Sequence, residues 1–211
     1  LGHRDKMVRW LQATGCEAPD GLQHCLDEVS CVYAEPDPAL LTFSHGDPAP
    51  SNNHIAEDRV RLLDFEYGTF RHVLYDLSAW SVLCPLPTAV LADMVQCFRG
   101  ELGGTCPRMQ DGYEFRQAWA ALCIYRGFAM LTWISPDVLQ QDRPWGDGGG
   151  WTCRRAVYAA MARVRDATAS VARYRPVYET ASRLVQALEL RYGEFADAAA
   201  ITPQWNAFSD A

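Results

Sequence analysis

The feature that most restricts the fold of this chain is the confinement of strand-like sequence to one short stretch. Residues 39–44 predict a short buried strand, and residues 54–65 predict a hairpin that turns at residues 57–59. Helical periodicity covers residues 4–14 and 22–32 before this stretch, and 76–83, 88–100, 112–134, 152–174 and 177–192 after it. A small sheet between helical segments predicts an α+β, mostly helical fold.

The expected helix ends follow from local residue types. Asp20 is a candidate N-cap for the second helix, which Pro36 ends, and Thr152 is a candidate N-cap for a later one. Gly15 and Gly193 are expected stop signals. No strand precedes the glycine run at residues 146–150, so we expect a flexible connection there instead of a phosphate-binding loop. Residues 194–211 lack periodicity and predict an irregular tail.

The composition excludes several classes of protein. The 211 residues are 49% hydrophobic and 21% charged, as in an ordinary globular domain. A net charge of −7 with Lys6 as the only lysine argues against nucleic acid as a partner. No uncharged stretch is long enough for a membrane span and no signal-peptide pattern opens the chain, so we expect a cytoplasmic protein. The eight cysteines contain no CxxC pair, which favours buried, reduced thiols.

One ordered set of residues carries chemistry. His45-Gly-Asp-Pro-Ala-Pro-Ser-Asn52 fits the pattern HxDxxxxN, and Leu62-Leu-Asp-Phe-Glu66 follows after the hairpin. Taken alone, Asp47, Asn52 and Asp64 are each more typical of turns and strand ends. Their joint occurrence around a strand, a loop and a hairpin favours a functional site. Carboxylate and amide oxygens are also the ligands that magnesium prefers.

This stretch resembles the catalytic loop and metal motif of the aminoglycoside phosphotransferase and choline kinase group, relatives of the protein kinases that carry HxDxxxxN and then DFG. Glu66 stands here where the motif has glycine. The resemblance covers residues 39–80 by motif and the remainder by helix pattern alone. It implies the C-terminal lobe of the protein-kinase-like fold, with a small catalytic-loop β-hairpin and a helical bundle. Residues 1–211 would form one domain: leading helices 1–38, catalytic loop and metal hairpin 39–75, helical subdomain 76–193, and tail 194–211.

The resemblance also implies roles for individual residues. Asp47 would orient the acceptor hydroxyl and take its proton, while Asn52 and Asp64 would hold Mg²⁺, with ATP as the co-substrate. His45 would support the site by packing beneath the loop and hydrogen-bonding backbone near Asp64. Asp76, in a segment that resembles the "DLA" of this group with Ser78 in place of alanine, would brace the loop through backbone amides. An N-cap role for Asp76 is compatible with that bracing.

The ATP-binding part of such an enzyme is missing from this sequence. Nothing before His45 predicts a glycine-rich β-hairpin with a strand lysine, and Lys6 lies in the first expected helix. We therefore expect that the N-terminal ATP-binding lobe is absent here, that it belongs to a longer gene product, and that it packs on this chain. On its own, the chain is expected to bind ATP feebly.

Three functions compete at this point. The leading hypothesis is an O-phosphotransferase for a small hydroxylated molecule such as an aminoglycoside, amino alcohol or sugar, without a membrane or nucleic-acid partner. A pseudokinase or scaffold fragment would keep the lobe for partner contacts and expose an apolar patch. A metallohydrolase would use His45, Asp47, His54 and Asp64 as ligands. Substrate-binding residues stay unassigned, although six acidic and aromatic residues are available: Glu114, Trp133, Asp137, Asp142, Trp145 and Trp151.

Overall fold

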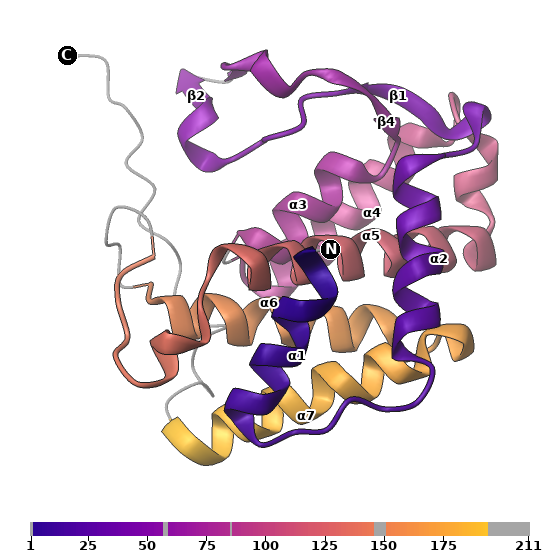
Figure 1. The fold of residues 1–211 in the computed structure, drawn as a ribbon. Coiled ribbons are helices and arrows are strands. Elements are labelled where there is room, and N and C mark those ends of the chain that lie inside the picture. The colour runs from indigo at the N-terminus through magenta and orange to yellow at the C-terminus, as the bar shows by residue number, and fades with distance from the viewer. Residues whose placement is uncertain (1, 57–58, 85, 146–150, 194–211) are drawn as a thin grey trace.

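The computed structural model describes residues 2–56, 59–84, 86–145 and 151–193, and its fold is α+β and mostly helical, as predicted (Figure 1). The helices of this part are α1 (Gly2–Thr14), α2 (Leu22–Ala34), α3 (Tyr75–Leu83), α4 (Thr88–Leu102), α5 (Gly112–Trp133), α6 (Cys153–Thr168) and α7 (Arg175–Tyr192). The strands are β1 (Leu41–Ser44), β2 (Asn53–Ala56), β3 (Arg59–Leu62) and β4 (Thr69–His72). The expectations for the glycine run and for the C-terminal tail fall outside the described residues.

The strands form two separate antiparallel pairs, which lie together at one end of the molecule in Figure 1. The predicted hairpin is confirmed as β2 and β3, with Asn53 opposite Leu62. β1 pairs with β4, with Phe43 opposite Phe70. We did not predict β4, because its four residues, Thr69 to His72, are too few to give a clear alternation.

The prediction of a buried strand over residues 39–44 was wrong in two respects. Pro38–Leu40 form a turn of 3₁₀ helix, begun by Asp37, whose side chain accepts a hydrogen bond from the Ala39 amide at 2.9 Å. The strand therefore begins at Leu41. It is also mostly exposed, since only Ser44 of its four residues is buried, and its one described sheet neighbour is β4.

The core is built around α5, which packs against α1, α2, α3 and α6. Residues 120–124 of α5 are all buried, so this helix is apolar on nearly every side. Gly127 allows the close approach of α6. A Cβ at this position would lie 2.4 Å from Val164 Cγ2 and 3.1 Å from Met161 Cε. The helical body packed around α5 thus supports α3 and the loops beside it.

Most expected helix ends are confirmed, with two corrections. Gly15 and Gly193 have positive φ angles of 74° and 62°, and Thr152 caps α6 through the Arg155 amide. The N-cap of α2 is Gly21 instead of Asp20, with φ of 79° and no side-chain hydrogen bond. The helix expected over residues 152–174 ends at Thr168 and is followed by a 3₁₀ turn (Ala172–Tyr174). The side chains of Val171 and Tyr174 in this segment are buried.

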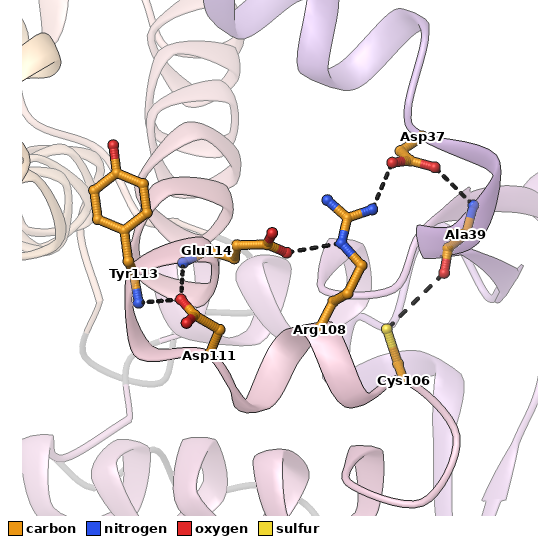
Figure 2. Close-up of polar contacts among 7 residues, drawn as sticks. All are labelled: Asp37, Ala39, Cys106, Arg108, Asp111, Tyr113 and Glu114. Atoms are coloured by element: carbon orange, nitrogen blue, oxygen red, sulfur yellow. Dashed lines mark hydrogen bonds and ion pairs between the residues drawn. The ribbon is translucent and has the colours of Figure 1, made fainter.

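An ion-pair triad fixes the entry to β1 against the start of α5. Figure 2 shows Arg108 between two carboxylates, 2.5 Å from Asp37 Oδ2 and 2.8 Å from Glu114 Oε2. The hydrogen bond to Arg108 is the main reason that the pKa of Asp37 is lowered. Asp111 caps α5 by accepting from the amides of Tyr113 and Glu114. Because Asp37 begins the turn before β1, the triad helps to place that strand.

The cysteines are all free thiols, but the prediction that they are buried holds for only some of them. Cys25, Cys106, Cys123 and Cys153 are buried, whereas Cys31 and Cys97 are exposed. Among the described helices, none is both long and apolar enough to cross a membrane.

Candidate active site

Asp76 joins α3 to the end of β1 and the start of the motif loop. Its Oδ1 accepts from Ser44 Oγ at 2.8 Å and from the Gly46 amide at 3.1 Å, and its Oδ2 accepts from the His45 amide at 2.7 Å. Hydrogen bonds to an ionised carboxylate are stronger than those between neutral groups. This is the bracing contact that the resemblance implies. The N-cap interpretation was wrong, because the N-cap of α3 is Leu74 and Asp76 lies in the first turn.

Gly46 turns the chain sharply between His45 and Asp47. Its φ is 89°, a region that side chains strongly disfavour. A Cβ here would lie 2.5 Å from the carbonyl oxygen of Tyr67 and 2.7 Å from Arg71 Nη1. The close packing of this turn against the segment before β4 therefore requires glycine.

His45 is buried and links the loop to the end of the hairpin. Its Nε2 lies 2.7 Å from the Leu63 carbonyl oxygen, and its Nδ1 accepts from the Asp47 amide at 3.3 Å. Both contacts fit a neutral imidazole that carries its proton on Nε2. The ring also packs on Phe65, with 4.5 Å between centroids. Both ring nitrogens are thus used for structure, which leaves neither for a metal.

The structure brings Asp47 and Asn52 into contact and sets Asp64 nearby on the hairpin. Asn52 Nδ2 donates to the Asp47 carbonyl oxygen at 2.9 Å and lies 3.4 Å from Asp47 Oδ2. The Leu63 amide donates to the Asn52 carbonyl oxygen at 2.8 Å, so Asp64 comes one residue after the partner of Asn52. Asp64 has a left-handed backbone, with φ of 59°. Aspartate tolerates this conformation better than most residues.

Asn52 and Asp64 suit a magnesium ion by their chemistry. The Asn52 nitrogen is used in the bonds to Asp47, so the amide oxygen is the atom left for a metal, with Ser51 Oγ 3.4 Å from it. The Asp64 carboxylate is exposed and makes no cap hydrogen bond. One carboxylate and one amide oxygen, completed by phosphate oxygens and water, form a set that Mg²⁺ accepts.

The ligands of the metallohydrolase hypothesis do not gather. Within the described ranges, no three His, Cys, Asp or Glu side chains are placed to hold one metal ion. His45 is committed to the Leu63 carbonyl and the Asp47 amide, and His54 lies on β2 opposite Arg61 of β3. This hypothesis therefore has no support from the geometry.

A pocket of about 520 Å³ opens beside Asp47. Its walls are mostly aromatic and aliphatic, with Asp47 and Arg126 as the charged members. The lining residues are Gly46, Asp47, Pro48, Ala49, Tyr67, Tyr75, Ala79, Leu83, Cys84, Tyr125, Arg126, Ala129, Trp133 and Trp145. Burial, helped by the negative charge of Asp47 and opposed by the positive charge of Arg126, raises the pKa of the Cys84 thiol to about 12. The Cys84 thiol is therefore a neutral part of the pocket wall.

Sequence reasoning found this pocket only in part. Of the six unassigned candidates, Trp133 and Trp145 line it. The other four have other contacts: Glu114 binds Arg108, Asp137 accepts from Ser135, Asp142 accepts from the Arg154 amide, and Trp151 is in the core. Tyr125, Arg126 and Ala129 were missed. With Trp133 they follow helical spacing on one face of α5, and an arginine within the apolar run that follows Gln117 was the available signal.

The surface of the two strand pairs is apolar and exposed. Phe43 and Phe70 are 56% and 68% exposed. We call this the hairpin surface and define it as Phe43, Val60, Leu62, Leu63, Phe65, Tyr67 and Phe70. Phe43 packs against both Phe65 and Phe70, with 6.1 Å between ring centroids in each pair, so exposed apolar side chains gather here and indicate a contact surface.

Neither a scan against protein-family models nor a search of curated proteins found a match to this chain.

Proposed function

We propose that this chain is the catalytic lobe of an ATP- and Mg²⁺-dependent O-phosphotransferase with the protein-kinase-like fold, acting on a small hydroxylated molecule. One observation carries the proposal. Asp47 lies on the loop that Asp76 holds, contacts Asn52 and lines a pocket. Asp64 directly follows Leu63, whose amide donates to the Asn52 carbonyl oxygen. Phosphoryl transfer needs such positioning more than it needs covalent chemistry from the protein.

In the proposed reaction, Asp47 acts on the acceptor hydroxyl. The contact with Asn52 is made by Oδ2 of Asp47, which leaves Oδ1 for the hydroxyl. The hydroxyl proton passes to Asp47 as the acceptor oxygen bonds to the γ-phosphorus of ATP, and the bond from that phosphorus to its bridging oxygen breaks to release ADP. Magnesium, held by Asn52 and Asp64, would neutralise phosphate charge. Asp76 and His45 keep the loop in place throughout.

We propose that the ATP-binding lobe packs on the hairpin surface. This surface lies next to Asp64, and its apolar side chains would be covered by a segment that carries a glycine-rich hairpin and a strand lysine. Reading the coding sequence upstream of Leu1 tests this part. A β-rich segment with those features supports the phosphotransferase. A segment without them supports the scaffold alternative, which the exposed hairpin surface also fits.

The role of Asp47 is tested by Asp47→Ala in the gene product that contains both lobes. Transfer from radiolabelled ATP to an acceptor panel should fall by about 10²–10⁴-fold, because the general base is lost. The matched control is Asp93→Ala, which removes an exposed carboxylate from α4, away from the pocket. Circular dichroism should show both variants folded. Full turnover in Asp47→Ala would contradict the assignment.

A further inference from the structure

Arg126 is a buried cation in the wall of the pocket, and none of the described residues gives it a carboxylate partner. Arg126 is 6% exposed and lies on α5, where it lines the pocket beside Asp47. Its one hydrogen bond is from Nη2 to the Tyr75 carbonyl oxygen, at a long 3.5 Å. Nε is buried with no hydrogen-bond partner, and none of the ion pairs among the described residues includes Arg126.

The aromatic neighbours of Arg126 satisfy only part of the guanidinium. Its central carbon lies 3.9 Å from the centroid of the Tyr75 ring and 5.9 Å from that of Tyr125. Such contacts stabilise the face of the cation. The five N–H donors point outward in the plane of the group and need acceptors of their own. An unpaired buried charge is costly, so an arrangement of this kind is expected where a ligand supplies the missing anion.

We propose that Arg126 binds an acidic group, carboxylate or phosphate, of the acceptor molecule, so that the acceptor is a hydroxylated acid. This inference rests on the proposed function. The acceptor hydroxyl would meet Asp47 and its acidic group would meet Arg126, with the tyrosine and tryptophan side chains along its body. Repulsion by the Asp47 carboxylate fixes that orientation, because the acidic end is stable only at Arg126. A planar guanidinium pairs with carboxylate or phosphate through two parallel hydrogen bonds.

The Arg126 Nε–H signal in heteronuclear NMR spectra of the isotope-labelled chain reports this contact directly. The signal is assigned by its absence from Arg126→Lys. The probes are two matched pairs: mandelate with mandelamide, and glycerol phosphate with glycerol. We expect at least one anion to shift the signal saturably, and neither neutral partner to do so. The inference is wrong if both anions leave the signal unmoved up to about 100 mM, where even weak binding saturates, or if the neutral partners shift it equally.

Arg126→Gln gives a second measurement, read from tryptophan fluorescence because Trp133 and Trp145 line the pocket. Affinity for the binding anion should fall about tenfold to a hundredfold, as charge-assisted hydrogen bonds are lost, while affinity for the neutral partner stays unchanged. Equal affinity of wild type and variant for the anion would overturn the inference. The NMR titration of the wild-type chain needs no variant to fold and no turnover. Anion binding together with an active Asp47→Ala enzyme would therefore contradict the proposed function alone.

Discussion

At the scale of single residues, the candidate site depends on positions where few residue types are tolerated. Gly46 has a backbone that side chains disfavour, His45 uses both ring nitrogens, and Asp76 uses both carboxylate oxygens. The sequence made the importance of these residues visible through the motif. His45 is explained by its contact with the Leu63 carbonyl and Asp76 by its contact with Ser44, while a Cβ on Gly46 would meet the Tyr67 carbonyl. Ser44 and Tyr67 lie outside the motif.

Gly46→Ala should destabilise the chain by about 1–3 kcal/mol or more, because the positive φ is strained and the added carbon meets backbone. Gly100→Ala is the matched control. Gly100 lies within α4, where an added Cβ meets nothing within 4 Å, so alanine should stabilise by up to about 1 kcal/mol. Urea unfolding measures both. Equal stability of Gly46→Ala and wild type would contradict the described turn.

His72 predicts a pH dependence of stability. It is buried at the end of β4, and its Nδ1 accepts from the Leu74 amide at 3.1 Å. Burial, helped by the positive charge of Arg108, lowers its pKa from 6.5 to about 4. As the pH falls, this histidine therefore binds a proton in the unfolded chain before it does so in the folded one. The contribution of His72 to stability is complete above pH 6.5 and is lost as the pH falls from 6.5 to 4.

This loss should amount to about 3 kcal/mol in wild type. In His72→Asn, the side-chain oxygen can still accept from the Leu74 amide. This part of the pH-dependent loss of stability should be absent from the variant, since asparagine does not titrate. Urea unfolding of both proteins across this pH range is the measurement. Parallel pH curves for the two proteins would show that His72 is not buried as a neutral group.

At the scale of elements, the helices and the strands differ in how far they could be predicted. The helices were found because amphipathic periodicity and glycine stop signals act within a few residues. The pairing of β1 with β4 was not found, because Phe43 and Phe70 are distant in sequence and both are exposed. The sequence did not predict the part of the pocket wall formed by Tyr75 and Arg126 for a similar reason. These two residues meet only when α3 packs on α5.

The hairpin surface should contribute to association and not to the stability of this chain. Phe70→Thr should change the free energy of unfolding by less than about 1 kcal/mol, because the side chain is 68% exposed. Urea unfolding measures this change. Leu122→Ala, in the buried part of α5, is the contrast and should cost about 2–5 kcal/mol. A large loss of stability in Phe70→Thr would mean that this surface is already covered.

At the scale of the whole molecule, a helical body around α5 carries two short strand pairs at one end, and the candidate site lies where the two meet. Asp76 of α3 ties the body to the loop, and the hydrogen bond between Leu63 and Asn52 ties the loop to the hairpin. We propose that this junction gathers Asp47, Asn52 and Asp64 around one magnesium-bound phosphate group.

The most direct test is paramagnetic NMR broadening by manganese, a magnesium substitute, added with ATP to the isotope-labelled chain. We expect the amide signals of residues 52 and 64 and their neighbours to broaden first, and Asp64→Asn to remove the effect. Asp93→Asn should leave it intact. Broadening centred elsewhere, or undiminished in Asp64→Asn, would contradict the claim.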